Sequence, residues 1–129
     1  MCRLSINNLV PLSKSSLESF LKRFDYFRDS ELRQIEIISP SVIKITLAAQ
    51  DSARGFDWIT VSLEFSSVSD AKIIENSKLS HIDLGEGITL LYQEETFAFM
   101  IGTYNKLSDT QSSICYIKSS SLKYQEGSF

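Results

Sequence analysis

The first hydrophobic pattern along the chain has the spacing of an amphipathic α-helix. Its apolar positions recur at i, i+3, i+4 and i+7, which places them on one stripe at about 100° per residue. They are Leu17, Phe20, Leu21 and Phe24. Two N-terminal signals fit this helix: a hydrophobic staple in which Leu12 and Leu17 flank Ser13, or a capping box of Ser15 with Glu18. The pattern therefore predicts a short helix whose stripe packs on an apolar surface.

The hydrophobic period then changes to that of a β-strand. Ile35 and Ile37 alternate with polar residues, a Ser-Pro-Ser turn follows at 39–41, and residues 43–49 alternate again. Because Pro40 cannot donate a ladder hydrogen bond, it marks the turn between the two runs. Two alternating runs joined by a short turn predict a β-hairpin.

The next strand shows the cleanest alternation in the chain. One face carries Ile59, Val61, Leu63 and Phe65. The opposite face carries Trp58, Thr60, Ser62 and Glu64. Such alternation is typical of a sheet with one buried and one hydrated face.

The rest of the chain also reads as strands joined by polar segments. Further strands are expected at 71–75, 88–93, 97–104 and 113–124. The polar run "SSVSD" predicts a turn before the first of these strands. A long loop with one helical turn is expected at 76–87, and the tail from residue 125 is expected to fray.

One helix and about seven strands with short connections predict a single α+β domain over residues 1–129. Short connections imply antiparallel neighbours, because a parallel crossover needs a dozen or more residues. We expect the N-terminal amphipathic helix to pack on a curved, mostly antiparallel sheet. The helical stripe and the apolar row at 59–65 would then bury each other, and each fully buried side chain would contribute roughly 1.5–3 kcal/mol.

Composition and charge fit an ordinary globular domain. The 129 residues are 43% hydrophobic and 22% charged, and the net charge of −3 argues against a dedicated nucleic-acid binder, which normally shows a basic face. Residues 61–129 hold five Lys/Arg against nine Asp/Glu, a net of −4. This half is either a solvated surface or an acidic patch for a basic partner.

Cysteine usage and the N-terminal composition indicate a reduced, cytoplasmic protein. Two isolated cysteines form no disulfide framework; Cys2 is expected on a frayed terminus and Cys115 as a small buried residue. Residues 1–12 lack the apolar core of a secretory signal, and no apolar run has the length of a bilayer span.

The sequence shows no recognisable catalytic, metal or cofactor motif. His81 is the only histidine, and "LSHIDL" around it has no triad or zinc-ligand spacing. The "LGEG" segment lacks the Lys-Ser/Thr that follows a phosphate-binding loop. Glu94 and Glu95 are adjacent, so they fit a charged hairpin tip better than an acid–base pair. We therefore expect no enzyme activity, no metal and no cofactor.

Two features outside the predicted core call for an explanation. Trp58 lies on the hydrated face of its strand, where it is either an anchor for a partner or covered by the 76–87 loop. The cluster at 28–31 lies where the helical period ends. We expect the side chain of Asp29 or Ser30 to accept hydrogen bonds from backbone N–H groups and so fix this turn.

The stretch "YFRDSELRQIEI" resembles the Phe-His-Asp-Ala/Ser-x-Val/Leu signature of small bacterial immunity-type domains associated with polymorphic toxins. Phe27, Asp29 and Ser30 match this signature and are expected to define the fold. Arg28 stands where the family tends to have histidine, so no role of that histidine is carried over. The strand "VSLEFSSVSDAKI" and the Cys-containing "SICYIKSSSLKY" extend the resemblance over residues 24–124.

The resemblance implies a non-enzymatic protein that binds a cognate toxin domain, often a nuclease, and blocks it. The acidic half suits a basic partner, because opposite charges steer the encounter. The candidate contact residues are Trp58, Asp83, Glu86, Glu94, Glu95 and Asp109. Two other interpretations stay open: a small-ligand binder or enzyme with a pocket between helix and sheet, and a homodimer formed through a sheet face or edge. Neither nucleic acid nor membrane is expected as a partner.

Overall fold

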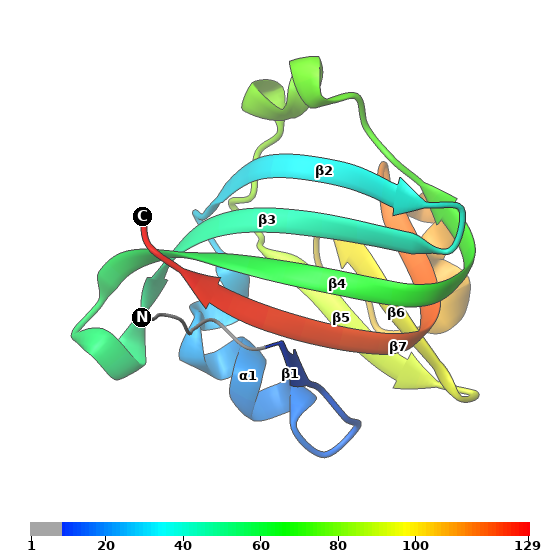
Figure 1. The fold of residues 1–129 in the computed structure, drawn as a ribbon, viewed down its shortest axis with the longest axis horizontal. Helices are drawn as coiled ribbons and strands as arrows, with labels where there is room; N and C mark the ends of the chain where they lie inside the picture. Colours follow the sequence, from blue (N-terminus) through cyan, green and yellow to red (C-terminus); the bar gives the residue numbers. More distant parts are fainter. Residues whose placement is uncertain (1–8) are drawn as a thin grey trace, which may run out of the picture.

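The strands form one antiparallel sheet, drawn in Figure 1 from a computed structural model that describes residues 9–129. The sheet order is β2-β3-β4-β7-β6-β5, and β1 pairs with β7. The strands are β1 (Val10–Pro11), β2 (Glu31–Ser39), β3 (Val42–Asp51), β4 (Asp57–Lys72), β5 (Ile88–Gln93), β6 (Thr96–Ile101) and β7 (Tyr116–Gly127). The helical segments are α1 (Leu17–Arg23) and the 3-10 turns η2 (Asp25–Phe27), η3 (Ser52–Arg54), η4 (Asn76–His81) and η5 (Leu107–Ser112). The prediction of a mostly antiparallel sheet of about seven strands is confirmed. The prediction for Cys2 lies outside the described residues.

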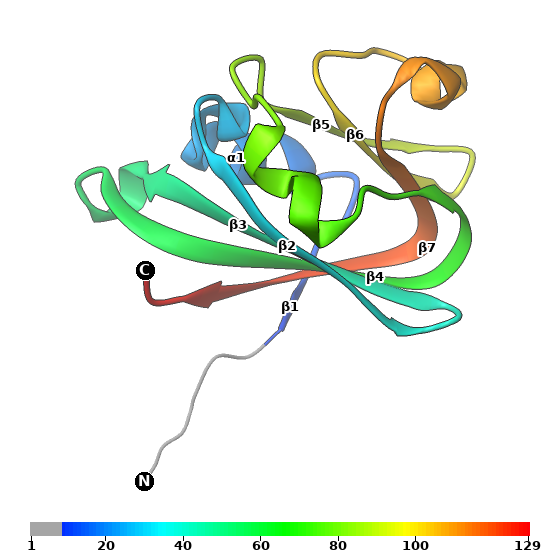
Figure 2. The same ribbon diagram turned by 90° about the horizontal axis from the view of Figure 1, so that it is seen from above.

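Strand β7 is central because it pairs along both of its edges. One edge pairs with β4, from Thr60 opposite Gly127 to Lys72 opposite Tyr116. The other edge is shared between β6 at its start and β1 near Tyr124. In Figure 2 the β5–β6 hairpin lies above β2, β3 and β4, so the bent sheet encloses the core between its two halves.

The alternation predicted for β4 is confirmed. Ile59 is 6% exposed, and the side chains that follow it in the apolar row, Val61, Leu63 and Phe65, are fully buried. On the opposite face Trp58 is 38% exposed. The hairpin around Pro40 is confirmed as β2–β3, and the helical turn expected in the 76–87 loop is η4.

Two predicted breaks in the sheet are wrong. The polar "SSVSD" run does not turn the chain, because β4 continues to Lys72 and bends there through a β-bulge between Val68 and Asp70, with Ser67 at φ +55°. No separate strand therefore begins at 71. The tail is not frayed either: residues 125–127 belong to β7 and pair with β4, since the long β4 supplies ladder partners for them.

The N-terminus of α1 differs from the capping box that the sequence offered. Ser16 is the N-cap residue and makes no side-chain cap, so the predicted capping box is wrong. The Ser16 hydroxyl instead accepts from the N–H of Ser13 at 2.8 Å, and Glu18 accepts a hydrogen bond from the Tyr26 hydroxyl. Helix α1 has seven residues, and its buried side chains include Phe20, whose ring centroid lies 4.6 Å from that of Tyr124 in β7.

Candidate functional site

The chain leaves α1 through a left-handed turn that contains no glycine. Asp25, Tyr26 and Phe27 have φ values of 53°, 58° and 59°, and Asp29 has 58°. Left-handed backbone costs an L-residue roughly 1–2 kcal/mol, so tertiary contacts must hold this turn. Phe27 is fully buried and stacks on Phe24 with ring centroids 5.0 Å apart. Strained backbone of this kind is common at functional sites, so the surface around η2 is a candidate site.

A glycine allows a second loop to dock against this turn. Gly87 has φ +77°, and a Cβ atom there would lie 2.1 Å from the carbonyl oxygen of Tyr26. The N–H of Asp29 donates to the carbonyl of Leu84 at 2.8 Å, which joins the loop to the turn. The 82–87 loop is therefore fixed against η2 by backbone contacts.

The expectation that side chains of Asp29 or Ser30 fix the turn is not confirmed within residues 9–129. The hydrogen bonds recorded at these positions come from their backbone N–H groups, with Ser30 donating to the Phe27 carbonyl at 3.3 Å. The left-handed backbone brings the N–H groups themselves onto carbonyl acceptors, so the side chains are not needed for this purpose.

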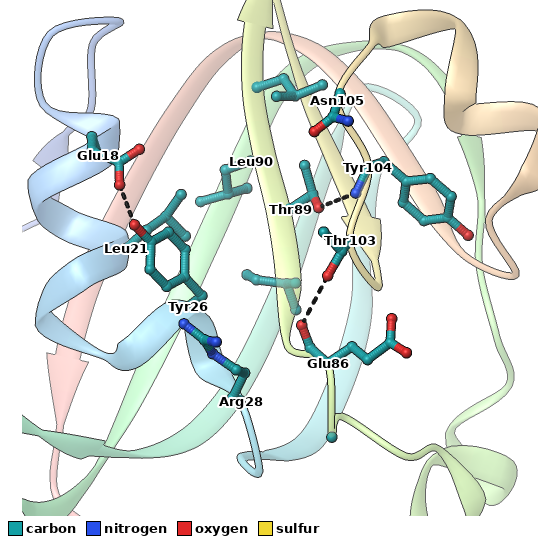
Figure 3. A pocket seen from close by; sticks show the side chains of 13 residues that line it. Glu18, Leu21, Tyr26, Arg28, Glu86, Thr89, Leu90, Thr103, Tyr104 and Asn105 are labelled. Carbon is teal, nitrogen blue, oxygen red and sulfur yellow. Dashed lines mark hydrogen bonds between the residues drawn. The ribbon is translucent and has the colours of Figure 1, made fainter.

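A cleft of about 590 Å³ lies between the α1–η2 segment and β5, and we call it the η2 cleft. Figure 3 shows Glu18, Tyr26 and Arg28 on one side, with Thr89 and Leu90 of β5 beside them. The remaining lining residues are Leu21, Gly85, Glu86, Ile88, Leu91, Thr103, Tyr104 and Asn105. Its volume falls within the range of ligand-binding sites, and its walls are both polar and apolar.

Among the residues that the structure describes, some charged side chains of the η2 cleft have bonding partners, and others do not. Arg28 forms an ion pair with Asp25 at 3.1 Å and lies over the Tyr26 ring, 5.1 Å from its centroid. The hydrogen bond from the Tyr26 hydroxyl to Glu18 raises the pKa of Tyr26, because the carboxylate favours the protonated phenol. No partner is recorded within residues 9–129 for the carboxylate of Glu86. The cleft therefore carries two carboxylates and one arginine that is already neutralised.

A second cleft, of about 380 Å³, lies on the other side of Arg28 and reaches Phe56 and Trp58. Trp58 packs against Phe129, with ring centroids 5.7 Å apart, and the guanidinium of Arg33 lies 4.9 Å from the Phe129 ring. Phe56 is 63% exposed and Phe129 is 64% exposed. We call Phe56, Trp58 and Phe129 the aromatic corner. Trp58 is not covered by the 76–87 loop, because η4 of that loop lies against β2 instead.

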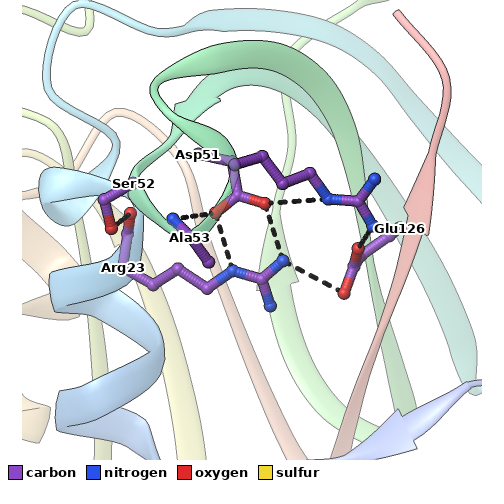
Figure 4. A network of polar contacts seen from close by, with 6 residues as sticks. Arg23, Asp51, Ser52, Ala53 and Glu126 are labelled. Carbon is purple, nitrogen blue, oxygen red and sulfur yellow. Dashed lines mark hydrogen bonds and ion pairs between the residues drawn. The ribbon is translucent and has the colours of Figure 1, made fainter.

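An ion network around the buried carboxylate of Asp51 lies next to the aromatic corner, and Figure 4 shows its geometry. The carboxylate of Asp51, fully buried, accepts from Arg23 through two bonds of 2.8 and 2.7 Å, and from the N–H of Ala53 at 2.9 Å. Arg54 contacts Asp51 at 3.3 Å and Glu126 at 2.5 Å. The bonds with Arg23 hold the pKa of Asp51 below its ordinary value, against the effect of burial. The network joins α1, the β3–β4 turn and the end of β7.

The predicted acidic contact residues lie in separate places. Asp83 accepts a hydrogen bond from the N–H of Gly85, and Glu86 borders the η2 cleft. Glu94 and Glu95 form the left-handed tip of the β5–β6 hairpin, as the sequence predicted for a charged turn. The carboxylate of Asp109 accepts from two backbone N–H groups in the loop before η5. The structure therefore places these residues along both ends of β5 and gathers none of them at Trp58.

The residues weighed for chemistry are not gathered into a reactive cluster in the described part of the chain. His81 lies exposed at the end of η4. Cys115 is buried as predicted, and burial raises its pKa to about 11. Residues 9–129 contain no group of three or more His, Cys, Asp or Glu side chains placed to hold a metal ion. The same residues include no helix with the length and apolar character of a membrane span.

Comparisons of the chain with protein-family models, curated proteins and solved structures find no match. Membership of an immunity-type family accordingly stays a prediction. Sequence reasoning missed the Arg23–Asp51–Glu126 network and the 103–105 wall of the η2 cleft. The only local signal for the cleft was Gly87, whose left-handed backbone permits the close approach to Tyr26.

Proposed function

We propose that this chain is a non-enzymatic protein-binding domain of the immunity type, which binds and blocks a cognate toxin domain with a basic surface. The observation that carries the proposal is the aromatic corner, where large apolar side chains stay exposed at one end of the sheet. Exposed aromatic residues on a rigid support are typical of binding hot spots. The ion network around the buried Asp51 supplies that support.

The rest of the molecule is consistent with a domain that binds its partner through surface residues rather than in an internal cavity. In this proposal α1 is the cover of the sheet, which the burial of Leu17, Phe20 and Leu21 and the contact between Phe20 and Tyr124 support. The core below it is filled by one continuous cluster of apolar side chains. The proposal keeps the cytoplasmic location expected from the sequence.

Charge supplies the second part of the proposal. Glu86 at one end of β5, and Glu94 with Glu95 at the other, are exposed carboxylates that attract a basic partner. Such residues raise the association rate more than they lower the dissociation rate. The aromatic corner provides the contact that keeps the complex together.

The experiment begins with the domain as bait in an extract of its native host, with mass-spectrometric identification of the captured protein. The purified partner is then titrated against the domain and two variants, Trp58→Ala and Phe56→Ala. We expect each variant to weaken binding at least tenfold, about 1.4 kcal/mol, because truncation of an interfacial aromatic residue leaves its pocket unfilled. The activity of the partner toxin should fall to background at a 1:1 ratio.

A matched control is Ile38→Ala, because Ile38 is also large, apolar and 51% exposed but lies near the β2–β3 turn, at the end of β3 opposite to the one that pairs with Trp58. Its affinity should stay unchanged. The double variant Glu94→Lys/Glu95→Lys should slow association and flatten its salt dependence. Equal affinities of the wild type and both aromatic variants would remove the corner from the interface, and an unaltered partner activity in the complex would end the immunity proposal.

A second candidate function is the binding of a small ligand in the η2 cleft. Its volume of about 590 Å³ and the polar groups of Tyr26, Thr103 and Asn105 on its walls favour this alternative. Native mass spectrometry of the protein purified from its host discriminates the two: a bound small molecule displaced by Leu90→Trp supports the ligand, whereas a captured polypeptide supports the main proposal.

A further inference from the structure

We infer that the surface between Arg33 and Trp58 is a seat for one aromatic side chain of the partner protein, and that Phe129 fills this seat until the partner displaces it. We call this surface the aromatic seat. The inference deepens the proposed function and rests on it, because Trp58 belongs to the aromatic corner through which the partner is proposed to bind. It gives Phe129 the role of a removable cover rather than that of a fixed contact.

The ring of Phe129 lies between two side chains from different strands. Its centroid is 5.7 Å from the centroid of the Trp58 ring, and the two planes are inclined at 47°. The guanidinium of Arg33 lies over the same ring, 4.9 Å from its centroid. Trp58 belongs to β4 and Arg33 to β2, so the chain beyond β7 crosses the end of the sheet, as seen beside the mark C in Figure 1. An aromatic ring in this place gains both an aromatic pair and a cation–π contact.

The strand between these two side chains has a small residue at this point. Ala48 of β3 pairs with Thr60 of β4 on one side and with Glu31 of β2 on the other. Side chains directly opposite each other on neighbouring strands share a face, so Ala48 lies on the hydrated face with Thr60. It is nevertheless fully buried, although it does not belong to the apolar cluster of the core. The hydrated face is therefore covered here, and alanine leaves room for a ring.

The contact that holds Phe129 in the aromatic seat is weak. The β7 ladder ends with Gly127 opposite Thr60. Beyond it, the hydrogen bond recorded for the chain up to residue 129 is that of the Thr60 hydroxyl to the Ser128 carbonyl, at 3.2 Å. Phe129 stays 64% exposed, so its ring buries little apolar area. Because hydrophobic stabilisation grows with the apolar area removed from water, a ring that the partner's own surface also encloses gains more than Phe129 does.

The guanidinium of Arg33 makes the aromatic seat selective. The carboxylate of Glu31 accepts a hydrogen bond from Arg33 at 2.8 Å and so orients the guanidinium. A cation above a ring is attracted by the negative face of the ring, which an aliphatic side chain lacks. The residue that the partner inserts is therefore phenylalanine, tyrosine or tryptophan, at an exposed position of its surface.

The first experiment asks whether Phe129 is a removable cover, and it needs no partner. Backbone order parameters are measured by ¹⁵N relaxation of the full chain. We expect a value below about 0.6 at the N–H of Phe129, against about 0.85 at Glu126 in the paired part of β7. A value of about 0.85 at both positions would overturn the inference, because a rigidly held ring does not leave the seat.

The second experiment tests the chemistry of the aromatic seat with two probes, acetyl-phenylalaninamide and acetyl-leucinamide. The Phe129→Ala variant, checked for folding by thermal unfolding, is titrated with each probe, and the indole N–H resonance of Trp58 reports binding. We expect the phenylalanine probe to bind at least threefold more tightly than the leucine probe, and more tightly than it binds the wild type, whose seat is filled. In the Phe129→Ala background, Arg33→Gln should remove the preference. Equal affinities for the two probes, or no binding of either, would overturn the inference.

The third experiment uses the captured partner and depends on the sign of one effect. We expect Phe129→Ala to bind the partner at least threefold more tightly than the wild type, which corresponds to a wild-type seat that is open for at most about a third of the time. The matched control Phe129→Tyr keeps a ring in the seat and should bind as the wild type does. Weaker or unchanged binding of Phe129→Ala would overturn the inference, because a fixed contact or an uninvolved residue gives those results.

The two proposals fail in different ways. A partner whose affinity falls in Trp58→Ala and also falls in Phe129→Ala would refute displacement and leave the proposed function intact. A partner whose affinity ignores Trp58→Ala and Phe56→Ala would refute the aromatic corner and, with it, the place of the partner's side chain in the aromatic seat.

Discussion

The substitution Asp51→Asn tests whether the ion network around the buried Asp51 holds the aromatic corner in place. Asp51 is fully buried, and Arg23 reaches both of its oxygens, at 2.8 and 2.7 Å. Asparagine keeps the shape but replaces one acceptor with an NH₂ group that faces the guanidinium. Removal of one partner of a buried ion pair costs about 3–5 kcal/mol. Arg23 is 22% exposed and keeps Glu126 at 3.1 Å, so we expect the lower limit, about 3 kcal/mol.

Urea unfolding followed by tryptophan fluorescence is the assay, since Trp58 is the only tryptophan. With a slope of about 1.5 kcal/mol per molar urea, a loss of about 3 kcal/mol lowers the midpoint by roughly 2 M. The control is Glu31→Gln, which breaks the exposed pair of Glu31 with Arg33, 2.8 Å apart, and should change stability by less than about 0.5 kcal/mol. A loss below about 1 kcal/mol for Asp51→Asn would refute the structural role assigned to the network.

The wild type and Asp51→Asn should also differ in how the free energy of unfolding depends on pH. The pKa of Asp51 is lowered in the folded state by its bonds with Arg23. Its contribution is therefore complete above the unfolded pKa of about 3.9 and is lost as the pH falls through the lower folded value. Since asparagine does not titrate, the difference in the free energy of unfolding between wild type and Asp51→Asn should narrow below about pH 4. A constant difference down to pH 2 would contradict the assigned pKa.

Three further predictions concern the turn, the edge and the thiol. Gly87→Ala should cost about 3 kcal/mol in urea unfolding, because the left-handed φ of +77° strains any L-residue and the new Cβ would meet the Tyr26 carbonyl at 2.1 Å. Asn76→Ala should cost about 1–2 kcal/mol through two lost hydrogen bonds and should accelerate amide exchange at Ile35; unchanged exchange there would show that the edge of β2 is not capped by this side chain. In a Cys2→Ser background, Cys115 should react with a disulfide reagent at pH 8 about a hundredfold more slowly in the folded state than in denaturant, because its pKa is about 11.

Several parts of the fold followed directly from the hydrophobic pattern. The alternation through Ile59, Val61, Leu63 and Phe65 correctly separated the buried from the hydrated face of β4. The Ser-Pro-Ser and Glu-Glu turns correctly placed the β2–β3 and β5–β6 hairpins. Local patterns succeed here because the side-chain direction of a strand has a period of two, which any short window of sequence displays.

The failures have a common physical origin in partners distant along the chain. The polar "SSVSD" run has the composition of a turn, yet it stays in β4 because β7 supplies ladder partners along that length. The tail from Gln125 is ordered for the same reason. Composition indicates the turn preference of an isolated segment. Pairing with a strand that is distant in the sequence satisfies the backbone hydrogen bonds of that segment and keeps it extended.

The sequence by itself determined a mostly antiparallel sheet with one short helix, an apolar core and a buried thiol, because burial and period are encoded residue by residue. Only the tertiary structure decided where recognition can occur. The left-handed η2 turn exists because Phe24, Phe27 and the loop at Gly87 hold it, and the η2 cleft exists because β5 ends the bent sheet opposite α1. These features depend on contacts between residues far apart in the chain, which no local window contains.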